Sequence, residues 1–298
     1  MPSTEFQSYL DALRNLGDQS AMSIEELRAA TERKALPAAA DVTCIPVEAP
    51  GLRAEWSQTP GASAEHVLLF FHGGGYYRGS IAAMRELSSR LARMGGVRGL
   101  SAAYRLAPEH TFPAAVEDAV TAYRWLLEQG VAAGNVIVSG ASAGGGLALA
   151  LLLAAREQGL PLPAGAVVLS PWVDLTQSGE TFATHAAADP VISKAYLDRF
   201  AGMYLGDADP MQPLASPVFG ELAGLPPVLI QVGGAETMLD ESRRFAAKAR
   251  QAGVEVRLDE WPEMVHVWQA CGMRVPEARD AIEQAGAWMR GRLGLPRR

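Results

Sequence analysis

The sequence has 298 residues, of which 49% are hydrophobic and 20% are charged, and its formal net charge is −7. A chain of this size and apolar content can bury a large core, which favours one elaborated α/β domain over two independent domains. The negative charge is spread along the chain, and this argues against nucleic acid or an anionic membrane surface as a partner.

The cysteines and the N-terminus bear on where the protein works. Cys44 and Cys271 stand far apart without metal-ligand spacing, which is typical of ordinary thiols in a reducing compartment. The first residues lack the basic and apolar regions of a signal peptide, and the longest apolar run, residues 147–155, is too short to cross a bilayer. We therefore expect a cytoplasmic protein with no metal, no cofactor and no stable membrane insertion.

Residues 1–40 precede the first strand pattern and are helical by their spacing. Apolar residues recur at helical intervals between Phe6 and Leu13, and a capping box formed by Ser23 and Glu26 begins a second helix, which Pro37 ends. This segment is an addition to the core. It is either a helix pair docked on the core or part of a lid over the site.

Strand and helix patterns alternate through the rest of the chain. Strand patterns cover residues 42–47, 52–58, 67–71, 99–103, 166–169, 228–232 and 254–260, with a further strand beginning at residue 136. Helical patterns cover residues 84–94, 113–129, 143–156, 193–205, 239–252 and 277–293. This alternation predicts a mostly parallel sheet with helices on both faces and ligands at the carboxyl ends of its strands.

Two glycine-rich segments follow buried strand patterns. Three glycines between His72 and Tyr76 leave backbone N–H groups uncovered, which suits the close approach of a ligand oxygen; the alternative is a flexible connector. Further on, Ser142 stands between Gly140 and Gly144 where a strand meets a helix. This spacing is typical of a serine on a strained turn with an exposed hydroxyl, although small residues also crowd ordinary strand-to-helix turns. Neither segment has the spacing of a phosphate-binding loop, so nucleotide binding is disfavoured.

The alternation is interrupted between residues 175 and 213. This stretch is rich in aromatic and methionine residues and contains the helical pattern of residues 193–205. It is either a second lid segment over an apolar pocket or a packed surface helix.

A serine nucleophile requires a base and an acid, which in this fold class follow it in the order acid, then histidine. Of the five histidines, only His266 follows the last strand pattern, in a loop at its carboxyl end. For the acid, Glu236 lies in the turn after strand 228–232, Asp240 begins the next helix, and Asp174 follows the preceding strand. Glu236 is favoured because a turn directly after a strand can aim its carboxylate at the imidazole, whereas Asp240 has an alternative role in complementing the helix dipole.

Five blocks together resemble the bacterial esterases of the hormone-sensitive lipase family. They are residues 72–75 (HGGG), 104–110 (YRLAPEH), 140–144 (GASAG), 170–175 (SPWVDL) and 264–268 (MVHVW). The resemblance runs from about residue 40 to the C-terminus. It implies an α/β-hydrolase fold with a core of residues 41–175 and 214–298 and a helical cap made of residues 1–40 and the insertion 176–213. It also implies the hydrolysis of carboxylic esters of small molecules.

The resemblance further implies a role for each matching residue. Ser142 is the nucleophile, His266 is the base, and the N–H groups of Gly74, Gly75 and Ala143 bind the oxyanion. Family members commonly carry aspartate where this chain has Glu236. The residues expected to line an apolar pocket for short to medium acyl chains are Tyr76, Tyr77, Trp172, Phe200, Met203 and Tyr204.

Three further hypotheses stand beside this one. Lactone or amide hydrolysis would use the same three residues. A non-catalytic protein of the same fold would bind a ligand without turning it over, and such proteins typically lack part of the triad. By analogy with the family, a homodimer could form through the edge strand near Val254.

Overall fold

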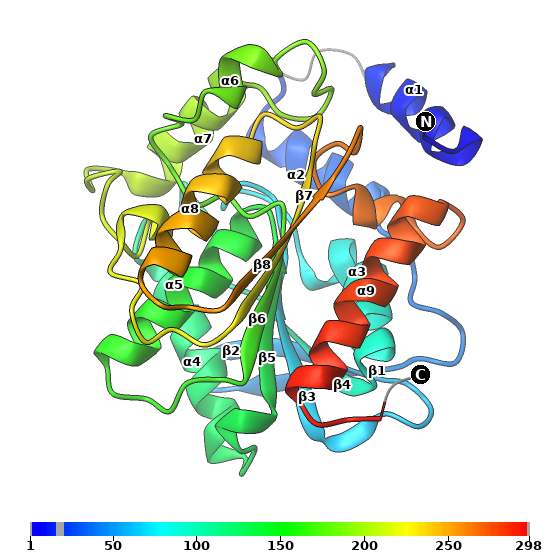
Figure 1. Cartoon of the computed structure of the whole chain (residues 1–298), viewed down its shortest axis with the longest axis vertical. Coiled ribbons are helices and arrows are strands. Elements are labelled where there is room, and N and C mark those ends of the chain that lie inside the picture. The colour runs from blue at the N-terminus through cyan, green and yellow to red at the C-terminus, as the bar shows by residue number, and fades with distance from the viewer. Residues whose placement is uncertain (1, 16–20, 297–298) are drawn as a thin grey trace.

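Eight strands form one sheet at the centre of the molecule in the computed structural model, which describes residues 2–15 and 21–296 (Figure 1). The strands are β1 (Thr43–Ala49), β2 (Leu52–Gln58), β3 (Ser63–Phe71), β4 (Val97–Ala102), β5 (Val136–Ala141), β6 (Gly165–Leu169), β7 (Val228–Gly233) and β8 (Val256–Trp261). Their order across the sheet is β1-β2-β4-β3-β5-β6-β7-β8. β2 pairs antiparallel with β1 and β4, and the other neighbours pair parallel. The expected mostly parallel sheet is confirmed.

Helices cover both faces of this sheet. One face carries α4 (Ala114–Glu128), α5 (Ala143–Glu157) and α8 (Leu239–Gln251), and the other carries α3 (Ile81–Gly95) and α9 (Pro276–Arg292) (Figure 1). Successive residues of β3 alternate between them, since Leu69 and Phe71 pack on the first face and Leu68 and Phe70 on the second. The apolar run of residues 67–71 is continuous because both faces of the strand are buried.

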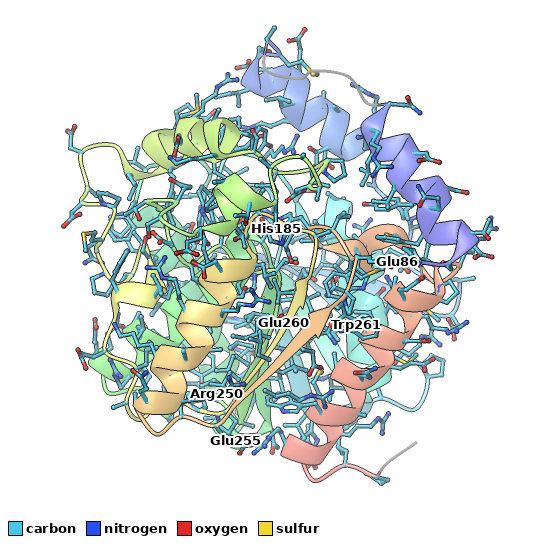
Figure 2. All side chains as sticks on the ribbon, turned by 45° about the horizontal axis from the view of Figure 1, so that its top comes forward. Glu86, His185, Arg250, Glu255, Glu260 and Trp261 are labelled. Atoms are coloured by element: carbon cyan, nitrogen blue, oxygen red, sulfur yellow. The ribbon has the colours of Figure 1, made fainter. Side chains whose placement is uncertain are left out.

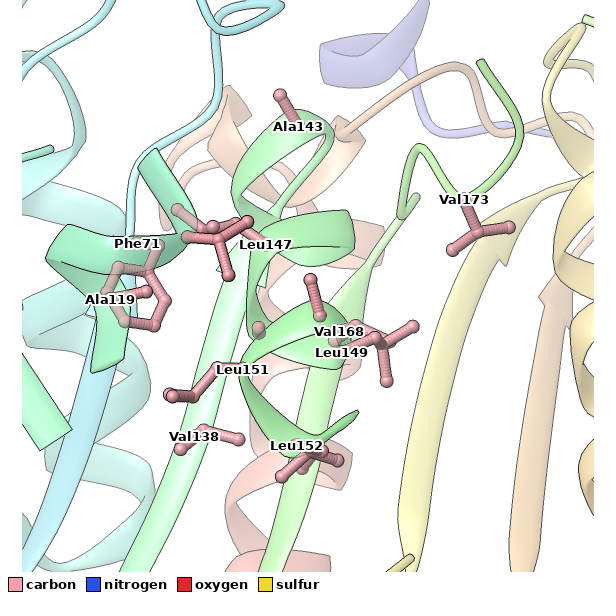
Figure 3. Packing of buried hydrophobic residues seen from close by; sticks show 14 of the residues in the cluster. Phe71, Ala119, Val138, Ala143, Leu147, Leu149, Leu151, Leu152, Val168 and Val173 are labelled. Carbon is pink, nitrogen blue, oxygen red and sulfur yellow. The ribbon is translucent and has the colours of Figure 1, made fainter. Parts of the chain in front are cut away.

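The helix α5 is buried on all its sides as far as Ala155. Its leucines pack between the sheet and the neighbouring helix α4, as Leu147 and Leu151 do beside Phe71 and Val138 (Figure 3). A helix that is apolar all round has to lie inside the molecule. The N-terminus of α5, directly after Ser142, is therefore held in a fixed position relative to the sheet.

The remaining helices are α1 (Thr4–Arg14), α2 (Ile24–Arg33), α6 (Thr181–Thr184) and α7 (Lys194–Leu205), with 3₁₀ turns η1 (Ala133–Asn135), η2 (Pro217–Phe219) and η3 (Trp268–Cys271). The capping box predicted at Ser23 and Glu26 is present at the start of α2. Helices α1, α2, α6 and α7 all lie at the end of the sheet where the parallel strands finish, at the top of Figure 1. They therefore stand above the ends of the strands that carry the predicted site.

Two elements of the sheet and its helix layers begin three or four residues earlier than the sequence pattern predicts. β3 begins at Ser63 rather than at residue 67, because residues 63–66 extend the strand although the register with β4 shifts between Ser63 and Val67. These residues are polar or partly exposed, so they carry no apolar signal. Helix α3 begins at Ile81 rather than at residue 84, because the hydroxyl of Ser80 caps it by accepting a hydrogen bond from Ala83 N.

β8 is an edge strand, and among the described residues it pairs only with β7. Exposed carboxylates flank it, Glu255 just before its start and Glu260 near its end (Figure 2). Charged residues on an edge strand oppose uncontrolled pairing with other chains. A homodimer through this edge stays a prediction. Among the helices within the described ranges, none has the length and apolar character that crossing a membrane requires.

Candidate active site

Ser142 occupies a strained turn between β5 and α5. Its φ is +54° and its ψ is −123°, a conformation that is rare for residues other than glycine. The turn is fixed by hydrogen bonds, since Ser142 N donates to Leu169 O at 2.9 Å and Ser142 O accepts from Trp172 N at 3.0 Å. Ser142 is partly buried, whereas its neighbours Ala141 and Ala143 are fully buried.

The glycines on either side of Ser142 are required by close packing. A Cβ atom on Gly140 would lie 2.1 Å from the carbonyl oxygen of Gly144, and one on Gly144 would lie 2.2 Å from the carbonyl oxygen of Phe71. Backbone atoms of the strand and of the helix occupy that space, so neither position accepts a side chain. The motif is thus explained by sterics, as its spacing predicts.

A line of hydrogen bonds runs from Ser142 through His266 to Glu236. Ser142 Oγ lies 2.9 Å from His266 Nε2, and His266 Nδ1 lies 2.7 Å from Glu236 Oε2. Because an ionised carboxylate only accepts, Nδ1 carries the proton, and Nε2 is left to accept the serine hydroxyl. His266 is 6% exposed and Glu236 is fully buried, so Ser142, which is partly buried, is the most exposed of the three residues.

The other two candidate acids point elsewhere. Asp174 is buried and accepts hydrogen bonds from Thr176, Ser178 and Arg244. Burial by itself raises the pKa of Asp174, but these hydrogen bonds lower it below its ordinary value overall. Asp240 lies in the first turn of α8, where acidic residues favour the helix dipole. Of the three acids, only Glu236 is hydrogen-bonded to His266.

The second oxygen of Glu236 is held as firmly as the first. Oε1 accepts the hydroxyl of Ser170 at 2.9 Å and the N–H of Gly233 at 2.5 Å. The sequence pattern does not predict that Ser170 contacts Glu236. The signal that could have indicated this contact is the place of Ser170 in the SPWVDL block, directly after β6.

Residues 72–77, the glycine loop, follow β3 and lie against the serine. A Cβ atom on Gly73 would be 3.4 Å from Ser142 Cβ, and Gly74 and Gly75 have φ values of +124° and +60°. The buried ring of His72 holds the start of this loop by donating from Nδ1 to Gly73 O at 2.9 Å. Burial lowers the pKa of His72 to about 4, so this ring is neutral at pH 7. The start of the loop is thus held next to Ser142 by the neutral ring of His72.

Aromatic residues predicted to line a pocket pack in two stacked pairs. The rings of Tyr76 and Tyr204 are 3.8 Å apart, and those of Tyr77 and Phe200 are 3.6 Å apart. All four are at most 1% exposed, as is Trp172, while Met203 is half-buried. Each pair joins a residue of the glycine loop to a residue of α7.

A separate groove of about 660 Å³ lies beside β1, β2 and the start of α3. It is lined by ion pairs, among them Arg28 with Glu109 and Arg85 with Glu55. Neither Ser142 nor His266 lines it. Its charged walls do not suit an acyl chain, and no group of three metal-ligating side chains occurs within residues 2–15 and 21–296.

Comparison with known proteins agrees with this geometry. The sequence profile of the α/β hydrolase fold family matches residues 68–270. An acetyl-hydrolase of Streptomyces hygroscopicus is 49% identical over 81% of this chain and 80% of its own length, and an esterase of Acinetobacter venetianus is 37% identical over 80% and 78%. The fold and the hydrogen-bonded serine, histidine and carboxylate define the class of the α/β hydrolases.

Solved structures narrow this class. A crystal structure of an esterase from the bacterial hormone-sensitive lipase family superposes with a TM-score of 0.96 at 42% identity, covering 99% of this chain and 100% of that one. The esterase EstE5, soaked with p-nitrophenyl butyrate, superposes with a TM-score of 0.95 at 42% identity, covering 98% and 99%. The chain belongs to the bacterial hormone-sensitive lipase family of α/β-hydrolase-fold esterases.

Proposed function

We propose that this esterase cleaves carboxylic esters of short to medium acyl chains through an acyl-enzyme on Ser142, with His266 as the base and Glu236 as the acid that orients it. The observation that carries the proposal is the unbroken hydrogen-bond line from Ser142 Oγ to Glu236 Oε2. All three groups are in line, which favours turnover over a non-catalytic binding role. Lactones would be hydrolysed by the same mechanism, but none of the contacts described above favours a lactone over an open-chain ester.

The acylation step uses each group in turn. Nε2 of His266 takes the hydroxyl proton as Ser142 Oγ attacks the ester carbonyl, and the resulting imidazolium is stabilised by the carboxylate of Glu236. The tetrahedral intermediate then collapses when Nε2 gives that proton to the leaving alcohol. Water attacks the acyl-enzyme by the same route, with His266 again as the base, and releases the acid.

The oxyanion of the tetrahedral intermediate needs fixed donors. We assign this role to the N–H groups of Gly74, Gly75 and Ala143. Ala143 is the first residue of α5, so its N–H has no partner within the helix and points along the positive end of the dipole. The glycine loop lies against Ser142 through Gly73, and this closeness supports the role proposed for its N–H groups.

The acyl group is proposed to lie against the stacked aromatic pairs below α7. Tyr76, Tyr77, Phe200 and Tyr204 form a closely packed aromatic wall that is at most 1% exposed, and the half-buried Met203 adds an adaptable side chain. The insertion 176–213 and residues 1–40 would then form the cap above this wall. Rings that are already in contact leave little room, which favours short chains. The naming of one relative as an acetyl-hydrolase points the same way.

A p-nitrophenyl ester series from acetate to palmitate tests this proposal, with the wild type and Ser142→Ala measured side by side. We expect activity to peak at short chains and to fall by about 10⁵-fold or more in Ser142→Ala, because the nucleophile is removed. Circular dichroism confirms that the variant folds. Equal activity in both proteins would overturn the role of Ser142, and a maximum at palmitate would overturn the short-chain assignment.

A further inference from the structure

One buried hydroxyl contacts both the acid and the loop of the base. Ser170 is the first residue after β6 and has no exposed surface. Its Oγ donates to Glu236 Oε1 at 2.9 Å and accepts from Val267 N at 3.1 Å. Val267 directly follows His266. The Ser170 hydroxyl thus donates its single proton to Glu236 and accepts a hydrogen bond from the loop that carries His266.

The backbone is strained at both residues that the Ser170–Val267 hydrogen bond joins. Ser170 has a φ of +45° and Val267 has a φ of +51°, a left-handed conformation that is costly for a β-branched residue. Strain of this kind persists only where the surroundings fix the conformation. A glycine would adopt the angle of Ser170 freely, so a serine is explained there by what its side chain does rather than by the turn.

The segment at the end of β6 also contacts the third member of the line. Leu169 O accepts the N–H of Ser142 at 2.9 Å, and Trp172 N donates to Ser142 O at 3.0 Å. Residues 169–172 are therefore joined to Ser142, Glu236 and the loop of His266 within four positions. A rigid support of this kind sets the mutual distances of reacting groups.

We propose that Ser170 is a positioning residue that sets the angle between Glu236 and His266. The inference rests on the proposed function, since it concerns the same hydrogen-bond line. With its hydroxyl present, Glu236 Oε1 is held by two donors and Oε2 is left facing His266 Nδ1. Without it, Oε1 retains only the Gly233 N–H, the carboxylate can turn about its χ3, and the Val267 N–H is left buried without a partner.

Two variants separate the hydroxyl from the backbone strain. Ser170→Ala removes the hydroxyl and keeps the strain, whereas Ser170→Gly removes both. Ser139→Ala is the matched control, because Ser139 is a fully buried serine on β5 whose Oγ has no hydrogen-bond partner among the described residues. The three variants and the wild type are assayed with p-nitrophenyl butyrate for kcat and KM, after circular dichroism has established folding.

We expect kcat to fall by about 10- to 100-fold in both Ser170 variants, the effect of losing one hydrogen bond to a charged group. KM should stay within about threefold, because Ser170 does not touch the substrate. In single-turnover experiments acylation and deacylation should slow together, since His266 serves both steps. The Ser139→Ala variant should keep the wild-type kcat. If Ser170→Gly and Ser170→Ala matched Ser139→Ala in kcat, the positioning role would be overturned.

A spectroscopic readout keeps this test independent of ester turnover. The proton on His266 Nδ1, held between the imidazole and Glu236, is expected to give a far-downfield ¹H NMR resonance in the wild type and in Ser139→Ala. In both Ser170 variants it should move or broaden, because the carboxylate turns. An unchanged resonance in Ser170→Gly would overturn the inference. If the wild type hydrolysed no ester but this resonance were lost only with Ser170, the proposed function would fail while the positioning role stood.

Discussion

Glu236 is distinguished from its neighbour Asp240 by the direction in which the turn after β7 points its carboxylate. Both oxygens of Glu236 are hydrogen-bonded inside the protein, one to His266 and the other to Ser170 and Gly233. Asp240, half-buried four residues later, makes no such bond to the histidine. The role of the acid is therefore a matter of geometry rather than of residue type, since glutamate and aspartate carry the same charge.

Paired amide substitutions test this assignment. Glu236→Gln keeps the shape but offers a neutral group to His266, so we expect kcat to fall by roughly 10³- to 10⁴-fold. Asp240→Asn should stay within about twofold of the wild type. Both are measured as p-nitrophenyl butyrate hydrolysis at saturating substrate. Full activity in Glu236→Gln together with loss of activity in Asp240→Asn would show that Asp240 is the acid.

A further buried carboxyl, that of Glu241, lies outside the hydrogen-bond line. Burial raises its pKa well above the ordinary value, and the nearby charge of Asp174 raises it further, partly offset by the Val173 N–H and Arg244. Its Oε2 accepts Val173 N at 3.3 Å, while Oε1 has no partner among the described residues. The folded protein therefore keeps a proton on Glu241 at pH values where an unfolded chain has lost it.

This proton makes stability depend on pH. The folded state binds more protons than the unfolded state from about pH 4.3, the pKa of an unfolded glutamate, up to the raised pKa of the folded state. Glu241 should thus cost stability increasingly as the pH rises through this window. Glu241→Gln removes the effect, so we expect its Tm at pH 8 to exceed the wild-type Tm by about 2 °C or more. Thermal unfolding between pH 5 and pH 8 measures this, with exposed Glu221→Gln as the control. A Tm difference independent of pH would refute the explanation.

The insertion between β6 and β7 is fastened to the turn that carries Glu236. Asp189 is 8% exposed, and its Oδ2 accepts Thr237 N at 2.8 Å and Thr237 Oγ1 at 3.1 Å. Thr181 Oγ1 donates to Thr237 O at 2.6 Å and accepts from Asp240 N at 3.0 Å. Since Thr237 is next to Glu236, this part of the insertion supports the proposed acid and also lies above the candidate site.

Replacing the carboxylate of Asp189 by an amide should weaken the attachment of the insertion to the turn that carries Glu236. Oδ1 of Asp189 also accepts the N–H groups of Val191 and Ile192, so both oxygens of Asp189 face donors. In Asp189→Asn one oxygen is replaced by an NH₂ group, which cannot accept a hydrogen bond from the donors that face it. We expect the free energy of unfolding to fall by about 1–3 kcal/mol, with a smaller loss of kcat. Urea unfolding measures it. Asp198→Asn, which removes a surface pair with Lys194, should cost less than about 1 kcal/mol. Equal costs in the two variants would contradict a supporting role for Asp189.

At the scale of the whole molecule, the sequence predicts the sheet well because both faces of its central strands are buried. A parallel sheet between two layers of helices is the arrangement that buries both the apolar run of residues 67–71 and the apolar helix after Ser142. The positions of Glu236 and His266 follow from chain order, because parallel strands bring their carboxyl ends to one edge. Chain order together with the glycine spacing around Ser142 and the turn that directly follows strand 228–232 thus predicts the three residues of the hydrogen-bond line.

What the sequence does not reveal depends on contacts between distant segments. Ser170 and Asp189 look like an ordinary serine and an ordinary loop aspartate, since their partners lie 66 and 48 positions away in the chain. The polar start of β3 is likewise held by its neighbour rather than by its own apolar pattern. The stacking of Tyr76 on Tyr204 requires knowing how α7 is placed over the glycine loop.

That stacking has a consequence for attempts to redesign this enzyme. The rings of Tyr76 and Tyr77 belong to the loop that carries the proposed oxyanion donors, and their partners Tyr204 and Phe200 belong to α7. Truncating Tyr204 or Phe200 to admit bulkier acyl groups would also remove the ring on which Tyr76 or Tyr77 stacks, and with it a contact that supports the loop of the proposed donors. We therefore expect acyl-chain range and turnover to be coupled, so that variants of α7 that accept longer acyl chains also lose turnover.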